Sequence, residues 1–244
     1  MAEVKSVSWR MSPLTAAACL IVAGLLCFHP LLRNTSFVVD DRFNILANTH
    51  LQTNPLRDIP TFWKAPYLEL YIPVTYTVWS VLAAAQSPVS GGKFDARPFH
   101  LLNMLLHLCN GVLVLLLLRR VTGDTLSSLL GALLYVVHPV QVEAAAWVTE
   151  LKTVLSASLA LLSMYTFLRA ASGFDTGKRA GVWAAYVGSL VLFALALLAK
   201  PISIVTPLLL AVLAGCVLHL PWRRVGVLLV PHLGLVVVMT LVTM

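Results

Sequence analysis

The sequence predicts an all-α fold, a polytopic bundle of transmembrane helices that crosses a bilayer about seven times. Of its 244 residues, 59% are hydrophobic and only 11% are charged, whereas a soluble domain carries about a quarter charged residues. The apolar residues also gather in blocks of about 18–22, the length that a helix needs to cross about 30 Å of hydrocarbon. We therefore expect a single transmembrane domain over residues 1–244.

Seven apolar blocks are the expected spans. Lys5 and Arg10 precede the first block, as in a signal peptide, but its apolar stretch is longer than the core of such a peptide. We interpret it as a retained span. In chain order the spans cover about residues 13–32, 98–118, 125–137, 154–168, 182–199, 202–220 and 225–244.

Residues 33–97 form the one long polar loop. Its prolines exclude a single continuous helix. Within it, Val74–Ala85 is apolar but too short to span, and the nearby aromatic residues Tyr71, Tyr76 and Trp79 are typical of a helix that lies in the membrane interface. We expect such an interfacial helix in the loop.

The basic residues predict the orientation of the bundle. The net charge of +7 does not indicate a nucleic-acid partner, because most basic residues flank apolar blocks and none form a patch interleaved with aromatic residues. With the N-terminus in the cytoplasm, the short outside connections hold only Lys152 and Lys200, as the positive-inside rule requires. The inside segments then hold Lys5, Arg10, Arg119, Arg120, Arg169, Lys178, Arg179, Arg223 and Arg224. The long loop is therefore expected to be extracytoplasmic.

Four polar residues recur along the second span: His100, Asn103, His107 and Asn110. At spacings of three and four they share one face of a helix. Polar groups at membrane depth are costly, so this face must meet other helices or water. We interpret Asn103, His107 and Asn110 as interhelical hydrogen-bonding residues. His100, at the outer end, is open to that role or to a functional one.

Acidic residues stand at the outer edge of the membrane. Asp40 and Asp41 follow the first span and have apolar neighbours on both sides, which holds the pair near the membrane surface. Adjacent carboxylates there are candidates for a general base. Glu143 and Glu150, seven residues apart, share a face if their segment is helical. With Lys152 they form either a structural salt-bridge cluster or part of a site.

Lys200-Pro201 interrupts an apolar run of about forty residues. Either the lysine snorkels to the interface, or it is a cation placed to hold a phosphate.

We expect neither a metal nor a cofactor. Four cysteines lie inside apolar blocks without metal-ligand spacing, and we interpret them as small buried side chains. Glycine-rich phosphate loops and His-Glu-x-x-His motifs are also absent from the sequence.

Five strings, in order and spacing, resemble the membrane part of the tetratricopeptide-repeat O-mannosyltransferase-like proteins. These are C-type glycosyltransferases related to the protein O-mannosyltransferases. The strings are Phe37–Ile45 (FVVDDRFNI), Tyr71–Thr75 (YIPVT), Pro98–Asn110 (PFHLLNMLLHLCN), His138–Lys152 (HPVQVEAAAWVTELK) and Leu198–Ile202 (LAKPI). The resemblance covers about residues 13–225.

The resemblance implies an inverting enzyme that transfers a mannose-like sugar from a polyprenyl-phosphate donor to a hydroxyl acceptor on the outer face. Asp40 or Asp41 would be the catalytic base. The recurrent outer-face positions, which would bind substrate, are His100, His138, Glu143, Glu150, Lys152 and Lys200. The implied partners are the bilayer, the lipid-linked sugar, and a protein acceptor or a partner membrane chain. Bacterial relatives imply a plasma membrane, and eukaryotic relatives imply the endoplasmic reticulum.

The chain departs from the family in two ways. Members usually have more spans and a C-terminal tetratricopeptide domain, so the chain is expected to be truncated. Where the family often has Glu-Arg-Lys-Asp, this chain has Glu150-Leu151-Lys152-Thr153. The alternative function is therefore a non-catalytic subunit of a larger membrane complex, derived from the same fold. A transporter would require internal repeats, which the sequence does not show.

Overall fold

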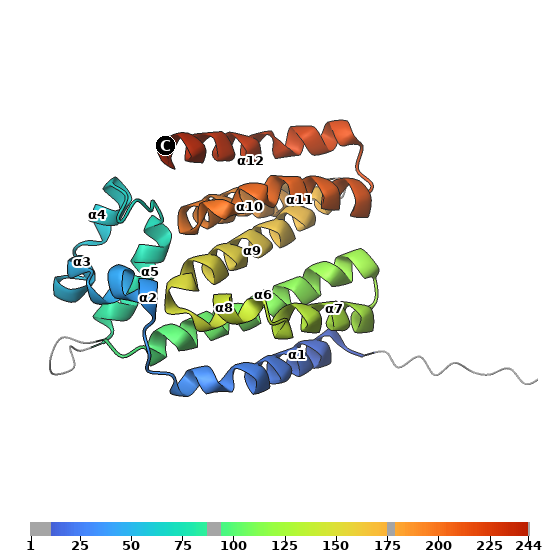
Figure 1. Cartoon of the computed structure of the whole chain (residues 1–244). Helices are drawn as coiled ribbons and strands as arrows, with labels where there is room; N and C mark the ends of the chain where they lie inside the picture. The colour runs from blue at the N-terminus through green and yellow to red at the C-terminus, as the bar shows by residue number, and fades with distance from the viewer. Residues whose placement is uncertain (1–10, 87–93, 175–178, 244) are drawn as a thin grey trace, which may run out of the picture.

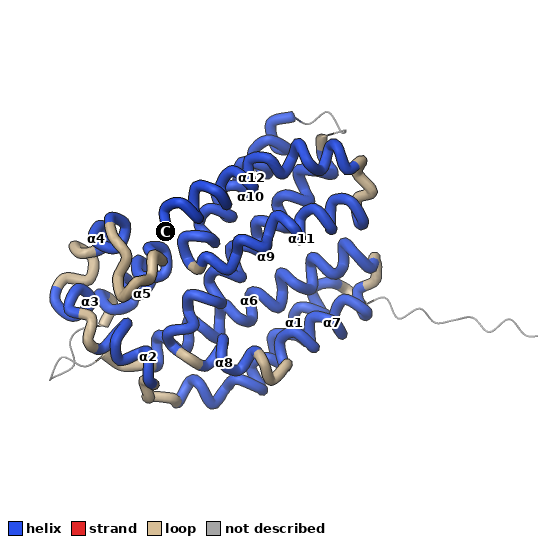
Figure 2. Tube along the Cα trace, turned by 45° about the horizontal axis from the view of Figure 1, so that its top comes forward, coloured by secondary structure: helices blue, strands red, loops and turns tan. Residues whose placement is uncertain are grey.

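The computed structural model describes residues 11–86, 94–174 and 179–243. Within these ranges all regular secondary structure is helical and there is no strand (Figure 2). Five helices there are long and apolar enough to cross a membrane, and two apolar segments are shorter. The prediction of a polytopic helical bundle is therefore confirmed.

The bundle helices follow the seven expected spans in order, although which of them crosses the bilayer stays a prediction. Long helices occur at α1 (Pro13–Phe28) continued by η1 (His29–Arg33), α6 (Arg97–Thr122), α9 (Leu151–Gly173), α10 (Arg179–Ala199) and α12 (Trp222–Thr243). The shorter ones are α7 (Thr125–Val137), and an irregular run of η4 (Pro201–Val205), α11 (Thr206–Val212) and η5 (Leu213–Val217). Between α7 and α9 lie α8 (Gln141–Ala146) and η3 (Val148–Glu150).

The two largest apolar cores of the bundle join different sets of helices. One lies between α1, α6 and α7, where Leu20, Leu108 and Val136 meet. Gly24 and Gly111 let these helices approach closely, because a Cβ at either position would collide with a leucine or valine of a neighbouring helix. The other core joins α9, α10, α11 and α12. Small residues at such crossings are typical of membrane helix packing.

The polar loop folds into a small lobe at one end of the bundle (Figure 1). Its elements are α2 (Val39–Asp41), the π-helix η2 (Arg42–Leu46), α3 (Thr49–Thr53), α4 (Ile59–Lys64) and α5 (Pro73–Ala84). Phe62 stacks on Tyr76 at 4.4 Å between ring centroids, and Trp79 is fully buried beside them. This aromatic core continues onto Phe99 of α6 and Leu151 of α9. The lobe is thus seated on the bundle, and α5 coincides with the helix expected at Val74–Ala85.

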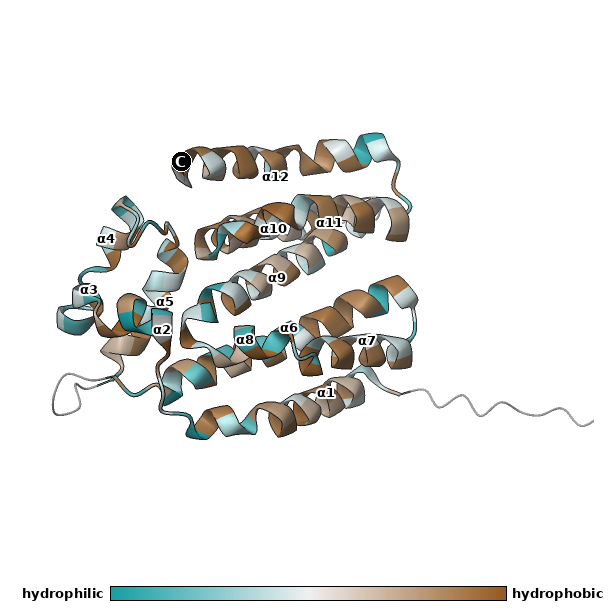
Figure 3. Cartoon of the chain, viewed as in Figure 1, coloured by the Kyte–Doolittle hydropathy of each residue, from teal (hydrophilic) through white to brown (hydrophobic). Residues whose placement is uncertain are grey.

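Hydropathy follows this division (Figure 3). The bundle helices are mainly apolar, and polar residues gather in the lobe and near helix ends. One expectation was wrong: Cys19, Cys27, Cys109 and Cys216 are all exposed on the bundle rather than buried. A helix face that contacts lipid is as apolar as one that contacts protein, so composition alone cannot separate the two.

Candidate functional site

The two adjacent aspartates have different surroundings. Asp41 is fully buried. Its Oδ2 accepts a hydrogen bond from the backbone N–H of Val38 at 2.8 Å, and its Oδ1 accepts one from the backbone N–H of Thr149 at 2.8 Å. The Thr149 hydroxyl also donates to Oδ1. The side chain of Asp40, by contrast, is exposed. Of the pair, only Asp40 is open to solvent.

Several contacts fix the backbone around the pair. The π-helix η2 begins directly after Asp41, and such segments often occur at functional sites. The Asn44 side chain donates to the backbone oxygen of Asp40 at 3.1 Å, and the Tyr76 hydroxyl donates to Asn44 Oδ1 at 2.9 Å. Burial, together with the nearby Tyr67, raises the pKa of Tyr76, so this hydroxyl keeps its proton and remains a donor.

A charged cluster lies on the segment that holds Asp41. Glu150, the residue after Thr149, is 3.3 Å from the Lys152 ammonium and 3.2 Å from that of Lys200. Thr153 donates to Glu150, and Lys200 Nζ lies 2.5 Å from the Thr153 hydroxyl. Two cations surround one carboxylate, so the cluster carries a net positive charge. We call Glu150, Lys152, Thr153 and Lys200 the Lys–Glu cluster.

The remaining predicted residues lie in three different settings. His100 is buried, and its Nε2 donates to the Ser36 carbonyl at 3.1 Å, while its Nδ1 has no protein partner among the described residues. His138 is exposed after α7, and its Nδ1 accepts from the Val140 N–H. Glu143 is exposed on α8. The structure therefore brings His100 toward the aspartate segment but leaves His138 and Glu143 outside the Lys–Glu cluster.

The separation of Glu143 from Glu150 has a local cause. The expectation that they share a face required one helix through both. Instead α8 ends at Ala146, and Trp147 has an extended backbone at φ −89° and ψ 125° before η3 begins. The expected continuous helix was wrong, so the seven-residue spacing does not place the two carboxylates on one face.

The polar face of α6 forms interhelical hydrogen bonds, as predicted. Asn103 donates to the Trp147 carbonyl at 2.7 Å, and Asn110 donates to the Val154 carbonyl at 3.0 Å. His107 donates to the Val136 carbonyl at 3.0 Å. Each accepting carbonyl lies near a helix end: Val136 in the last turn of α7, Trp147 just after α8 and Val154 in the first turn of α9. These three residues therefore hold the ends of α7, α8 and α9 against α6.

Thr149, like Thr153 of the Lys–Glu cluster, is a site residue that the sequence analysis missed. It is almost fully buried and provides two of the three hydrogen bonds that Asp41 accepts. A threonine between Val148 and Glu150 has no distinguishing pattern. Only its contact with a residue 108 positions earlier shows its role.

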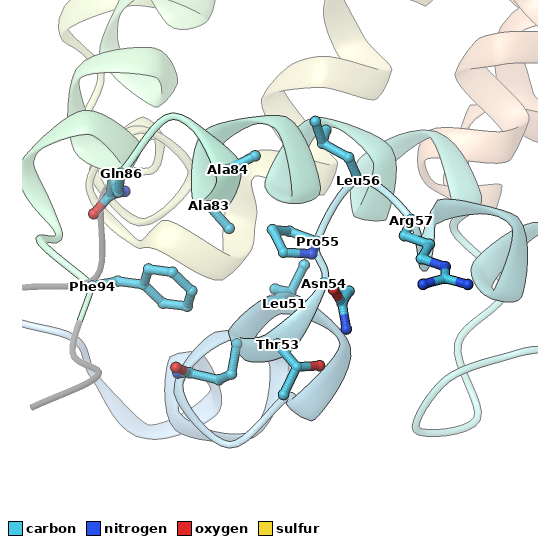
Figure 4. A pocket seen from close by; sticks show the side chains of 11 residues that line it. Leu51, Thr53, Asn54, Pro55, Leu56, Arg57, Ala83, Ala84, Gln86 and Phe94 are labelled. Atoms are coloured by element: carbon cyan, nitrogen blue, oxygen red, sulfur yellow. The ribbon is translucent and has the colours of Figure 1, made fainter.

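The two larger cavities of the lobe differ in how near they lie to the aspartates. An open one of about 460 Å³ is lined by residues on both sides of the aspartate pair, including Phe37, Val38 and Arg42. A second, of about 440 Å³, lies between α3 and α5 and contains none of the predicted site residues. In Figure 4, Leu51 and Thr53 lie on one side of it and Ala83 and Ala84 on the other. The first cavity is therefore the one that lies beside the aspartate segment, although neither aspartate lines it.

Fold and site together define a polytopic helical membrane protein with buried and exposed carboxylates, and a cationic cluster, at one end of its bundle. Known proteins with this sequence pattern are protein O-mannosyl-transferases. Tmtc2 of Drosophila melanogaster is 29% identical over 193 residues, which cover 78% of this chain and 20% of that protein. Tmtc1 of the same species is 28% identical over 79% of this chain and 22% of its own length. Mouse TMTC4 is 30% identical over 65% of this chain and 23% of its own length.

These relatives confirm the resemblance to the tetratricopeptide-repeat O-mannosyltransferase-like proteins. The chain spans about a fifth of the length of the curated relatives that it matches. No family model matches the chain, and no solved structure matches it significantly.

Proposed function

We propose that the chain is a membrane glycosyltransferase that transfers a mannose-like sugar from a polyprenyl-phosphate donor to a hydroxyl group of a protein acceptor. One observation carries the proposal. The segment that anchors Asp41 through Thr149 continues directly into Glu150 and the Lys–Glu cluster. A candidate base and candidate phosphate-binding cations are therefore neighbours at one end of the bundle. The relatives' names support the reaction class.

The exposure of the two carboxylates supports a division of roles. The exposed Asp40 is the general base, which takes the proton of the acceptor hydroxyl. The hydroxyl oxygen then forms a bond to the anomeric carbon from the side opposite the phosphate, and the bond from that carbon to the phosphate oxygen breaks. The configuration inverts, and the lipid phosphate leaves with the bonding electron pair. The buried Asp41 is a positioning residue, since its oxygens already accept three hydrogen bonds.

The leaving phosphate requires positive charge. An ammonium group has three donors, and Lys200 uses two of them on Glu150 and Thr153. One donor remains for a phosphate oxygen. With Lys152 alongside, the cluster stabilises the charge that develops as the bond breaks. His100, whose Nδ1 has no protein partner among the described residues, is a further candidate for contact with the sugar.

The orientation belongs to the same proposal. The basic residues favour a cytoplasmic N-terminus and a lobe on the outer face. The membrane would be the endoplasmic reticulum in a eukaryote and the plasma membrane in a bacterium. The relatives named above come from animals.

The test is transfer of radiolabelled mannose from polyprenyl-phosphate donors in purified membranes. Wild type is compared with Asp40→Asn, Asp41→Asn and, as a matched control, Asp95→Asn, a half-buried aspartate that pairs with Arg97. We expect Asp40→Asn to abolish transfer, Asp41→Asn to reduce it strongly, and Asp95→Asn to leave it unchanged. Full activity of inserted Asp40→Asn protein would reject the assigned base. Absence of transfer by the wild type with every donor would favour the non-catalytic subunit.

A further inference from the structure

A further polar hollow lies at the end of the bundle opposite the lobe, where α6 turns into α7 (Figure 1). It has a volume of about 280 Å³ and is lined by Leu116, Arg119, Arg120, Gly123 and Tyr165. The first four belong to the last two turns and the cap of α6, and Tyr165 comes from α9. None of these residues takes part in the site at the lobe.

Both arginines are held in place without an acidic partner. The Arg120 guanidinium lies over the Tyr165 ring, 5.1 Å from its centroid. Arg119 Nε donates to the Thr125 hydroxyl at 3.1 Å. Within the described residues neither arginine forms an ion pair. The nearby Asp124 carboxylate caps α7 by accepting from the Ser127 N–H. Each guanidinium therefore keeps unused donors.

The dipole of α6 explains part of this arrangement but not all of it. Arginines in the last turn of a helix are favoured by the partial negative charge there. That effect requires no hollow between α6 and α9 and no aromatic face under one guanidinium. Planar guanidinium groups with fixed geometry are suited to bidentate phosphate binding.

The position of the hollow along α6 matches that of a membrane surface. Arg119 lies 19 residues after His100 on the same helix, or about 29 Å at 1.5 Å per residue. That is close to the hydrocarbon thickness of about 30 Å. Around the hollow, Val121 and Leu126 are exposed apolar side chains. A ligand there would meet cations in the hollow and apolar side chains beside it, which matches a headgroup with attached acyl chains rather than a free ion.

We propose that this hollow binds the phosphate of an anionic phospholipid from the surrounding leaflet, with Arg119 and Arg120 as its ligands. Basic pockets between membrane helices are known to bind such headgroups. The bound lipid would brace the α6–α7 turn against α9, far from the site at the lobe.

The test is lipid retention measured by native mass spectrometry. Wild-type protein is purified from nanodiscs that contain equal amounts of phosphatidylglycerol and phosphatidylcholine, and is compared with Arg119→Gln/Arg120→Gln. The matched control is Arg223→Gln/Arg224→Gln, which removes two adjacent arginines at the start of α12, outside the hollow. We expect retention of phosphatidylglycerol to fall about thirtyfold in the first variant, since each basic side chain near an anionic surface contributes about fivefold. The control should retain the lipid.

A second measurement keeps the result independent of folding. Short-chain phosphatidylglycerol should raise the melting temperature of the wild type and of the control, and should leave that of Arg119→Gln/Arg120→Gln unchanged. Inorganic phosphate and short-chain phosphatidylcholine should have no effect on any of them. Equal loss of lipid in both double variants would overturn the proposal, because only net charge would then matter. Stabilisation by inorganic phosphate alone would also overturn it, in favour of a free-anion site.

Discussion

The hydroxyl of Thr149 is the group whose removal tests the candidate site most directly. Thr149→Val keeps the size of this nearly fully buried side chain and leaves its backbone N–H donor to Asp41 in place. The substitution removes only the Oγ1 donor to Asp41 Oδ1. It therefore creates no cavity, and any effect reports on the carboxylate.

The expected cost follows from that single lost bond. A hydrogen bond to a charged group contributes about 1.5–3 kcal/mol. Because Asp41 keeps its two backbone donors, we expect a loss near the middle of that range, about 2 kcal/mol. That corresponds to about a thirtyfold shift in the folding equilibrium. Transfer activity should also fall, since Asp41 fixes the segment that carries Asp40.

The assay is unfolding in mixed micelles titrated with sodium dodecyl sulfate, arranged as a double-mutant cycle with Asp41→Asn. The control is Thr166→Val on α9, whose hydroxyl bonds only to carbonyls of its own helix. We expect a coupling energy between Thr149 and Asp41 of about 1–2 kcal/mol. If the two single costs simply add, to within about 0.5 kcal/mol, Thr149 does not act through Asp41 and the reasoning fails.

Three further predictions concern the cluster, the lobe and the bundle. Lys200→Met should lower stability by about 1–3 kcal/mol, because Glu150 loses one of its two cations, and it should raise the KM for the lipid donor. The control Lys64→Met, on the exposed lobe surface, should change neither quantity. An unchanged KM for the donor in Lys200→Met would show that Lys200 does not bind the phosphate. Tyr76→Phe should cost about 1 kcal/mol below pH 10. Because the pKa of Tyr76 is raised in the folded protein, the Tyr76 hydroxyl stabilises the fold fully below the unfolded pKa of about 10, and this stabilisation is lost as the pH rises further. The melting temperature should therefore fall more steeply above pH 10 in the wild type than in the variant. Parallel declines of the two melting temperatures would contradict this. Gly111→Ala should cost about 1–3 kcal/mol of stability by overpacking, since the new Cβ would collide with Val136. The control Gly188→Ala, with open space around it, should be neutral or stabilising. Equal melting temperatures for the two variants would count against the close approach of α6 and α7.

The bundle could be predicted because its signal is local. A run of about 20 apolar residues indicates a span by length alone, and polar residues spaced by three and four indicate one helix face. That reasoning also found the interhelical bonds of Asn103, His107 and Asn110. The broken course of residues 201–217 through η4, α11 and η5 has no comparable signal, since its composition is as apolar as that of a straight span.

The site could be predicted only as a list of residue types. Asp40 and Asp41 are chemically identical neighbours, and the sequence left the choice of base open. The choice depends on which carboxylate meets Thr149, more than a hundred residues away. Glu143 and Glu150 would share a face on one continuous helix, but the extended backbone at Trp147 interrupts the helix between them. In both cases the deciding contact is long-range or the deciding dihedral has no local sequence signal.

The breaks in the helices explain why the lobe and the cluster belong together. Lys200 has an extended backbone at φ −158° and ψ 125°, so α10 ends at Ala199, and the Ala199 carbonyl is among the last carbonyls of a helix, which lack an intrahelical donor. The Ala196 carbonyl still accepts from the Lys200 N–H at 3.0 Å. Thr75 of α5 donates to the Ala199 carbonyl and Ser156 of α9 donates to the Ala196 carbonyl, each at 2.9 Å. The lobe therefore stabilises the conformation that turns Lys200 toward Glu150. Without Thr75 the Ala199 carbonyl, next to Lys200, would lose this donor, so the lobe contributes to the Lys–Glu cluster through a hydrogen bond to the backbone rather than through a charge.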